Sequence, residues 1–206
     1  MTGGAIYLAQ VMNSLDRWKD LGNVDVPNGT RLIGHVPHVA PMAYLHVIFA
    51  GLGGEQLEDL KKSAGRDLRD SLIEFYKVWN GCILFSGVLS INGLRTSYDR
   101  SIADADRQPF SIRTGNVPER PKNSDHDWVY FGGYNWDGSR LLMDETGKVV
   151  LTSRLDANDR KFRWDNLEDM LTSEVIRIAD MFDSHGRRRN PGESTLPPLA
   201  HTAGRG

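Results

Sequence analysis

Cys82 is the only cysteine in the chain and the first candidate for nucleophilic chemistry. It opens an apolar run, Cys82-Ile83-Leu84-Phe85, that has the composition of a buried strand. A catalytic thiol needs a neighbouring base and a lowered pKa, and an apolar strand supplies neither. The sequence therefore favours a small buried side chain at this position, with a hydrolase that uses Cys82 as an alternative.

Three histidines, His35, His38 and His46, fall within twelve residues and suggest a metal site. Structural zinc sites usually need four convergent ligands, and neither a second cysteine nor a His-Glu-x-x-His motif accompanies these histidines. The pair His126-Asp127 is half of a Ser–His–Asp arrangement, but the chain has no Gly-x-Ser-x-Gly motif to complete it. We therefore expect no metal, no cofactor and no catalytic triad.

A set of carboxylates occupies segments that we predict to be loops and turns. Asp137, Asp144 and Glu145 fall at the turns of a predicted series of hairpins, where Asp is favoured because its side chain bonds the local backbone. Two carboxylates held about 5 to 10 Å apart can hydrolyse glycosides, so a hydrolase that uses them is a further alternative. We favour a binding role, and the candidate binding residues are Asp104, Asp106, Asp125, Asp127, Asp137, Asp144 and Glu145.

The charge of the chain is small and unevenly spread. Its 206 residues include 25 Lys and Arg and 27 Asp and Glu, a net charge of −2. Residues 184–206 hold four Arg and one Glu, or +3, which leaves −5 for residues 1–183. A mildly acidic body argues against nucleic acid as a direct partner and favours a basic protein partner.

No stretch of the sequence suggests a membrane or export signal. No apolar run approaches the roughly 18 residues that a membrane helix needs. The N-terminus lacks the basic region and small-residue cleavage site of a secretory signal. We therefore expect a cytoplasmic protein that does not enter a membrane.

Helical periodicity dominates the first part of the chain. Apolar residues at steps of three and four predict helices over residues 5–21, 41–50, 55–64 and 66–79. Residues 23–41, with three prolines, are predicted to be an extended loop, and strands are predicted over 82–85 and 88–91. The polar segment 94–127 is predicted to be a long loop with one strand at 109–113.

Residues 128–182 contain the clearest strand pattern. Asp137-Gly138 between apolar runs predicts a hairpin, because glycine adopts positive φ without strain, and strands are expected over 128–134, 139–143 and 149–152. Asp165 followed by Glu168 has the signature of a helix start. This order predicts an α+β fold, a mainly antiparallel sheet (a meander) packed against N-terminal helices and one C-terminal helix.

Several weak motifs occur in an order that resembles the SUKH superfamily. An aromatic-bearing helix runs into Asn-Gly and then into a strand at Phe75, Tyr76, Trp79, Asn80 and Gly81. Further along, a strand, a Gly/Asp turn, an Asp-x-x-Gly-x-Val hairpin and a closing helix fall at Gly133-Tyr134, Asp137-Gly138, residues 144–149 and residues 164–171. The superfamily includes the fungal Smi/Knr cell-wall-assembly regulators and many bacterial immunity proteins.

The resemblance implies a domain organisation and a function. A SUKH-like α+β domain is expected over residues 41–183, after an N-terminal helix and loop at 1–40 and before a disordered basic, proline-rich tail at 184–206. The implied function is non-enzymatic protein binding by an immunity protein of the bacterial type, which neutralises a cognate toxin, often a nuclease. The alternative within the family is an intracellular regulator or scaffold without a toxin partner.

Overall fold

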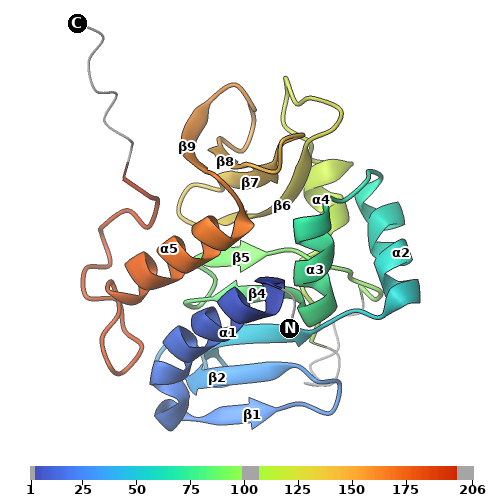
Figure 1. The fold of residues 1–206 in the computed structure, drawn as a ribbon. Helices are drawn as coiled ribbons and strands as arrows, with labels where there is room; N and C mark the ends of the chain where they lie inside the picture. The colour runs from blue at the N-terminus through green and yellow to red at the C-terminus, as the bar shows by residue number, and fades with distance from the viewer. Residues whose placement is uncertain (1–2, 99–106, 199–206) are drawn as a thin grey trace, which may run out of the picture.

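An antiparallel sheet organises the protein (Figure 1). The computed structural model describes residues 3–98 and 107–198. Over these residues nine strands are hydrogen-bonded in chain order, so each strand pairs with the next and the sheet is one continuous meander. The strands are β1 (Asn23–Asp25), β2 (Arg31–His35), β3 (Tyr44–Ala50), β4 (Trp79–Leu84), β5 (Leu89–Ile91), β6 (Val129–Tyr134), β7 (Arg140–Met143), β8 (Val149–Thr152) and β9 (Arg160–Trp164).

Helices cover one face of this sheet (Figure 1). α1 packs against both α5 and α3, and these three helices contribute to the main hydrophobic core. α2 contacts α3 and α4, and α4 packs on β6. The helices are α1 (Gly3–Leu15), α2 (Gly54–Ala64), α3 (Asp70–Val78), α4 (Ile112–Asn116) and α5 (Leu167–Ala179), with a 3-10 turn, η1 (Asp16–Leu21), that continues α1.

The core follows the alternation of side chains along the strands. Val149 and Leu151 of β8 belong to the main core under the helices. Val150, between them, packs with Tyr130 and Leu142 in a smaller cluster. Because successive strand residues point to opposite faces, this second cluster lies on the other side of the sheet. The predicted α+β architecture, an antiparallel meander with helices at both ends of the chain, is confirmed.

The Asn80-Gly81 pair joins α3 to the sheet. The Asn80 side chain donates to the carbonyl oxygen of Leu94 at 2.9 Å and accepts from the Leu94 N–H at 2.7 Å. Gly81 has a φ of +84°, and a Cβ there would lie 2.4 Å from the carbonyl oxygen of Ile91. Both residues belong to β4. The two hydrogen bonds from Asn80 hold Leu94, in the segment that follows β5, against the start of β4.

The helix predicted over residues 41–50 is wrong, because most of this segment forms β3. Both faces of β3 are buried. Leu45 and Ile48 belong to the main core, and Val47 and Phe49 belong to a separate cluster. A strand buried on both faces has a continuous apolar sequence, which periodicity alone does not distinguish from a short helix.

Three other segments differ from the prediction. The loop expected over residues 23–41 contains β1 and β2, and the strand expected at 109–113 overlaps the start of α4. The hydroxyl of Ser111 accepts from the Arg113 N–H at 3.3 Å and caps α4. β9 was not expected, because its basic residues, which are typical of a protected edge strand, hide the apolar pattern.

α5 begins two residues later than predicted. Asn166 is its N-cap, and the side-chain oxygen accepts from the Asp169 N–H at 2.8 Å. Asp165 instead lies in the short link from β9, where its carboxylate is 3.6 Å from the Lys148 ammonium. None of the helices within residues 3–98 and 107–198 has the length and apolar character that crossing a membrane requires.

The chain after α5 packs against the domain as far as Pro198, where the described part ends. The indole N–H of Trp18 donates to the carbonyl oxygen of Asp183 at 2.8 Å. Thr195 is fully buried. This arrangement differs from the disorder predicted for residues 184–206, because polar anchors that composition does not reveal hold the first part of the segment. Residues 199–206 lie outside the described part of the chain.

Candidate partner-binding surface

The turns of the meander alternate between the two ends of its strands. One row across β6, β7, β8 and β9 is formed by Val129, Met143, Val149 and Trp164. The segments directly beyond this row therefore meet at the same end of the sheet. They carry a group of carboxylates that we name the acidic rim, which consists of Asp125, Asp127, Asp144, Glu145 and Asp165.

Three carboxylates of the acidic rim form no salt bridge with Lys or Arg in the part of the chain that the structure describes. The Asp127 side chain is 65% exposed and contacts the ring of His126 at 3.1 Å. Asp125 accepts from the Asp127 N–H at 3.1 Å, and Glu145 accepts from the indole N–H of Trp128 at 2.9 Å. Within the described residues, none of these three carboxylates lies within 4.0 Å of a Lys or Arg nitrogen. Asp125 still interacts electrostatically with Arg120, and Arg66 and Arg69 line the same pocket as Asp127.

Trp128 gives the acidic rim a fixed aromatic centre. Its ring is half-buried and lies under the guanidinium of Arg160, 5.1 Å from the ring centroid. Arg120 donates to the carbonyl oxygens of Trp128, at 3.2 Å, and of Asp125, which holds this segment in place. Trp and Arg are the residue types that most often dominate the energy of protein interfaces. The rim therefore has the composition of a protein-binding surface.

Asp144 shapes the β7–β8 turn from within. Its side chain is only 13% exposed and accepts from the Thr146 N–H at 2.9 Å, the Thr146 hydroxyl at 2.6 Å and the Lys148 N–H at 3.0 Å. Partial burial acts to raise the pKa of Asp144, but these hydrogen bonds outweigh it and hold the pKa below its ordinary value. Asp144 therefore orders the turn that presents Glu145.

Asp137 lies at the opposite end of the strands, in the β6–β7 turn. It pairs with Lys161 of β9 and accepts from the Ser139 N–H at 2.9 Å. Partial burial acts to raise the pKa of Asp137, but the bonds from Lys161 and Ser139 hold it below its ordinary value. Asp104 and Asp106 lie outside the described residues. The structure thus brings four of the seven predicted residues together.

The hydrolase hypotheses find no support in the geometry. Cys82 is fully buried, and burial raises the pKa of its thiol to about 12, so the thiolate that catalysis needs is not formed near neutral pH. Asp137 and Asp144 are separated by the whole length of β7, and both are held as anions. An acid and base that act on one bond must face each other across it.

His46 is a core residue. Its ring lies between those of Trp18 and Phe85, with centroid separations of 5.3 and 4.7 Å. Burial lowers the pKa of His46 to about 3, and the neutral ring accepts from the Phe85 N–H at 3.3 Å through Nδ1. Over the described residues, no group of three or more His, Cys, Asp and Glu side chains is placed to hold a metal ion.

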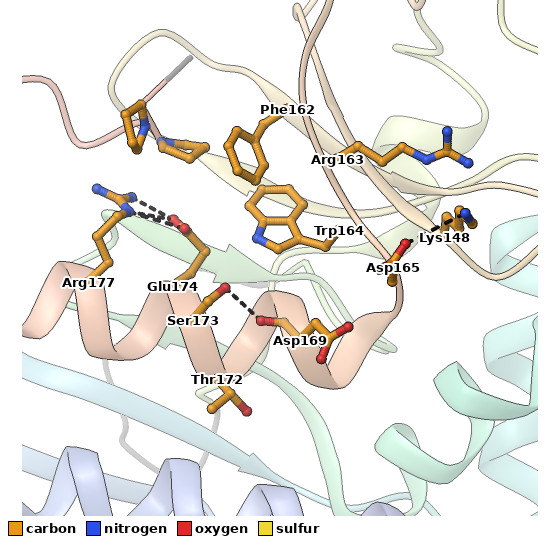
Figure 2. A pocket seen from close by; sticks show the side chains of 12 residues that line it. Lys148, Phe162, Arg163, Trp164, Asp165, Asp169, Thr172, Ser173, Glu174 and Arg177 are labelled. Carbon is orange, nitrogen blue, oxygen red and sulfur yellow. Dashed lines mark hydrogen bonds and ion pairs between the residues drawn. The ribbon is translucent and has the colours of Figure 1, made fainter. Parts of the chain in front are cut away.

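A second candidate region is the groove between β9 and α5 (Figure 2). The rings of Phe162 and Trp164 on β9 face α5 and lie 4.7 Å apart at their centroids. From α5, Glu174 and Arg177 point toward these rings. A cavity of about 760 Å³ opens between the two elements. We name this feature the β9–α5 groove.

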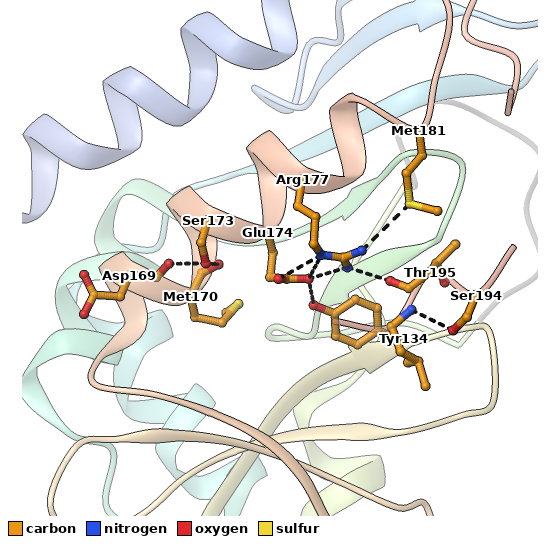
Figure 3. Close-up of polar contacts among 10 residues, drawn as sticks. Tyr134, Asp169, Met170, Ser173, Glu174, Arg177, Met181, Ser194 and Thr195 are labelled. Atoms are coloured by element: carbon orange, nitrogen blue, oxygen red, sulfur yellow. Dashed lines mark hydrogen bonds and ion pairs between the residues drawn. The ribbon is translucent and has the colours of Figure 1, made fainter. Parts of the chain in front are cut away.

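An ion pair between the buried Glu174 and the partly exposed Arg177 lines the β9–α5 groove (Figure 3). Glu174 is only 3% exposed; it accepts from the Tyr134 hydroxyl at 2.5 Å and from Arg177 Nη2 at 2.5 Å. Burial, and then the charge of Glu174, raise the pKa of Tyr134 well above its ordinary value, so the hydroxyl stays a donor. Arg177 also donates to the carbonyl oxygen of Thr195 at 2.6 Å. The buried Glu174 carboxylate is therefore paired, as burial demands.

The sequence-based site prediction does not include Glu174, Arg177 or Tyr134. A signal for two of them is nonetheless present. Glu174 falls on the apolar face of the closing helix, between Leu171 and Ile178, and Arg177 follows three residues later. An acidic residue at a core position with a basic residue one turn away indicates a buried pair.

A family model matches residues 51–173, which are more than half of the chain. The chain belongs to the SMI1 / KNR4 family (SUKH-1). The superfamily resemblance of the sequence is thereby confirmed. No curated protein matches the chain by sequence.

The SUKH-1 match covers the acidic rim completely and the β9–α5 groove only in part. It contains β4 to β9 and the whole acidic rim, and it ends within α5. β1, β2 and β3 precede it, although they continue the same sheet. Arg177 and the C-terminal segment that covers the β9–α5 groove follow it. The rim therefore belongs to the SUKH-1 part of the chain, and the covered groove lies partly beyond it.

Proposed function

We propose that the protein is a SUKH-1 immunity protein that binds a cognate protein toxin, such as a nuclease, in the cytoplasm of the producing cell and blocks it. The observation that carries this proposal is the match of residues 51–173 to the SUKH-1 family. Bacterial proteins of the superfamily that the sequence resembles act as antidotes of this kind. The proposed activity is binding, and the protein itself carries out no reaction.

The acidic rim is the proposed contact surface for a basic toxin. Asp125, Asp127 and Glu145 are exposed and form no salt bridge with Lys or Arg within the described residues, although Arg120 interacts electrostatically with Asp125; Trp128 lies beside Glu145. Opposite charge on a partner speeds association and fixes its orientation, while a half-buried aromatic ring supplies apolar contact. A nuclease toxin that binds a phosphate backbone carries such a basic surface.

The direct experiment pairs the full chain with the toxin domain encoded by the neighbouring gene. The proposal predicts a tight complex in isothermal titration calorimetry and restored growth when both proteins are expressed in a toxin-sensitive cell. The charge reversals Asp127→Lys and Glu145→Lys should weaken both effects. The matched control is Asp20→Lys, an exposed aspartate on η1, which contacts β2 and so lies several strands away from β6–β9. A toxin domain that neither binds nor is neutralised contradicts the proposal.

The family description also admits a second function, a regulator or scaffold without a toxin partner. A genome neighbourhood without a toxin, together with reproducible pull-down of one housekeeping protein, would favour that function. The acidic rim serves both cases as a protein-binding surface. The rim variants then separate them, because a toxin antidote loses protection of the cell, whereas a scaffold loses only its complex.

A further inference from the structure

The C-terminal segment crosses the β9–α5 groove and divides it into two cavities. Pro197 and Pro198 line both a cavity of about 760 Å³ toward Trp164 and a cavity of about 970 Å³ toward Met181. Arg177 also borders both cavities. The groove is therefore longer than the segment that crosses it, and open space remains on each side of the two prolines.

One hydrogen bond from the domain, together with packing of Leu196 against the main core, attaches the segment to the groove. Arg177 Nη2 donates to the carbonyl oxygen of Thr195 at 2.6 Å (Figure 3). Leu196 makes only a local bond, from its N–H to the hydroxyl of Ser194 at 3.2 Å. Within the described residues, the contact from Arg177 is the only hydrogen bond that links residues 194–198 to the rest of the protein.

The chemistry of the groove matches an extended, proline-containing peptide. Phe162 and Trp164 form an aromatic wall, and such walls receive proline rings in several recognition modules. Proline has no N–H, so a proline-rich peptide presents mainly carbonyl acceptors. Arg177, oriented by Glu174, is a donor already aimed at such a carbonyl.

The internal occupant fits the groove imperfectly. The hydroxyl of Thr195 is buried and has no hydrogen-bond partner within the described residues. A buried polar group without a partner destabilises the arrangement that holds it. The segment is also reached through an exposed turn at residues 190–194. An occupant held by one hydrogen bond and by the packing of Leu196, and weakened by a buried unpaired hydroxyl, is open to displacement.

We propose that the β9–α5 groove is a second binding site, for an extended proline-containing segment of a partner protein, and that residues 194–198 occupy it until that segment displaces them. This site adjoins the acidic rim, because Asp165 of the rim also lines its cavity of about 760 Å³, and part of it lies beyond the SUKH-1 match. Residues 194–198 compete with the partner peptide for the groove. The partner peptide must therefore bind more strongly than these residues do. Peptide binding requires no toxin, so the outcome does not depend on the proposed function.

The experiment measures binding of a fluorescent peptide, Glu-Ser-Thr-Leu-Pro-Pro, which copies residues 193–198, by fluorescence polarisation. The full chain is compared with a full-length variant carrying Leu196→Ser and Pro197→Gly, which weakens the internal occupant. The proposal predicts that this variant binds the peptide at least about ten-fold more tightly than the wild type. Adding Phe162→Ala should remove most of the gain, because the aromatic wall is lost.

Controls separate this site from a general effect of the C-terminal segment. Pro191→Gly changes an exposed proline outside the groove and should leave peptide affinity unchanged. A peptide with both prolines replaced by alanine should bind at least about ten-fold more weakly. If the Leu196→Ser/Pro197→Gly variant is folded but does not bind the peptide at millimolar concentration, the proposal is overturned. So does exchange of segments between two copies, seen as a dimer that excludes the peptide.

The wild-type chain provides a second measurement if the variant fails to fold. In an NMR titration with millimolar peptide, the indole N–H signal of Trp164 should shift in a saturable way. The amide signals of Thr195 and Leu196 should move toward those of a free chain at the same time. A Trp164 signal that does not respond overturns the proposal.

Discussion

The acidic rim and the β9–α5 groove differ in how far their carboxylates are exposed and paired. The Asp127 side chain in the rim is 65% exposed and forms no salt bridge with Lys or Arg among the described residues, whereas Glu174 in the groove is 3% exposed and fully paired. A buried charge without a partner is strongly destabilising, but an exposed one costs little. The groove pair therefore supports the fold, whereas we propose that the exposed rim carboxylates Asp127 and Glu145 serve a partner.

Loss of Arg177 gives the largest expected effect. Arg177→Met leaves the Glu174 carboxylate buried with only the Tyr134 hydroxyl as a donor, and it releases the Thr195 carbonyl. We expect the free energy of unfolding to fall by about 3 kcal/mol. Urea unfolding followed by circular dichroism measures this change.

The double variant Glu174→Leu/Arg177→Met tests why Arg177→Met loses stability. The cause is either the Glu174 carboxylate left without a partner or the packing lost with the Arg177 side chain. Replacement of a buried ion pair by apolar residues is often neutral, so the double variant should be more stable than Arg177→Met alone. If the double variant is instead the less stable of the two, the unpaired Glu174 is not the cause of the loss.

Asp144→Ala should have an intermediate effect, because Asp144 lies in the acidic rim but acts inside a turn. The change removes three hydrogen bonds that close the β7–β8 turn and leaves the Thr146 and Lys148 N–H groups without that acceptor. We expect a loss of about 1 to 3 kcal/mol in the free energy of unfolding. Glu145→Ala, one residue later and exposed, is the matched control and should change it by less than about 0.5 kcal/mol.

Acid should weaken the fold through Asp137 and Asp144. Both carboxyls have a pKa below the ordinary value in the folded protein. Their contribution to stability is complete above the ordinary pKa of about 4 and is lost as the pH falls through the lower folded pKa. We expect Asp137→Asn/Asp144→Asn to lose less stability than the wild type between about pH 6 and about pH 3. Equal losses in the two proteins contradict this assignment.

The sequence predicts the second half of the fold better than the first. Asp137-Gly138 and the apolar runs around it define β6, β7 and β8 because turn chemistry and alternation agree there. β3 is mistaken for a helix because both of its faces are buried, so its pattern has no period of two. Residues 184–198 show that a few polar contacts, such as those from the Arg189 N–H to the Met181 carbonyl oxygen and from Arg177 to the Thr195 carbonyl oxygen, can order a segment with little apolar content.

The candidate site likewise has a part that the sequence predicts and a part that it does not. Asp125, Asp127, Asp144 and Glu145 are predictable because turns and loops place acidic residues at the surface. Their gathering at one end of the sheet depends on strand register, which the sequence pattern alone does not fix. The Glu174 pair depends on Tyr134, forty residues away, and no local pattern reveals that contact.

The kinetics of association with the neighbouring toxin domain test the central claim most directly. We expect the wild-type association rate to fall steeply between about 0.02 M and about 0.5 M salt, because exposed charges are screened. Asp127→Lys/Glu145→Lys should reduce the rate by about ten-fold at low salt and leave the free energy of unfolding within about 0.5 kcal/mol. The Asp20→Lys control should retain the wild-type rate. An association rate that responds neither to salt nor to the rim reversals would contradict the acidic rim as the binding surface.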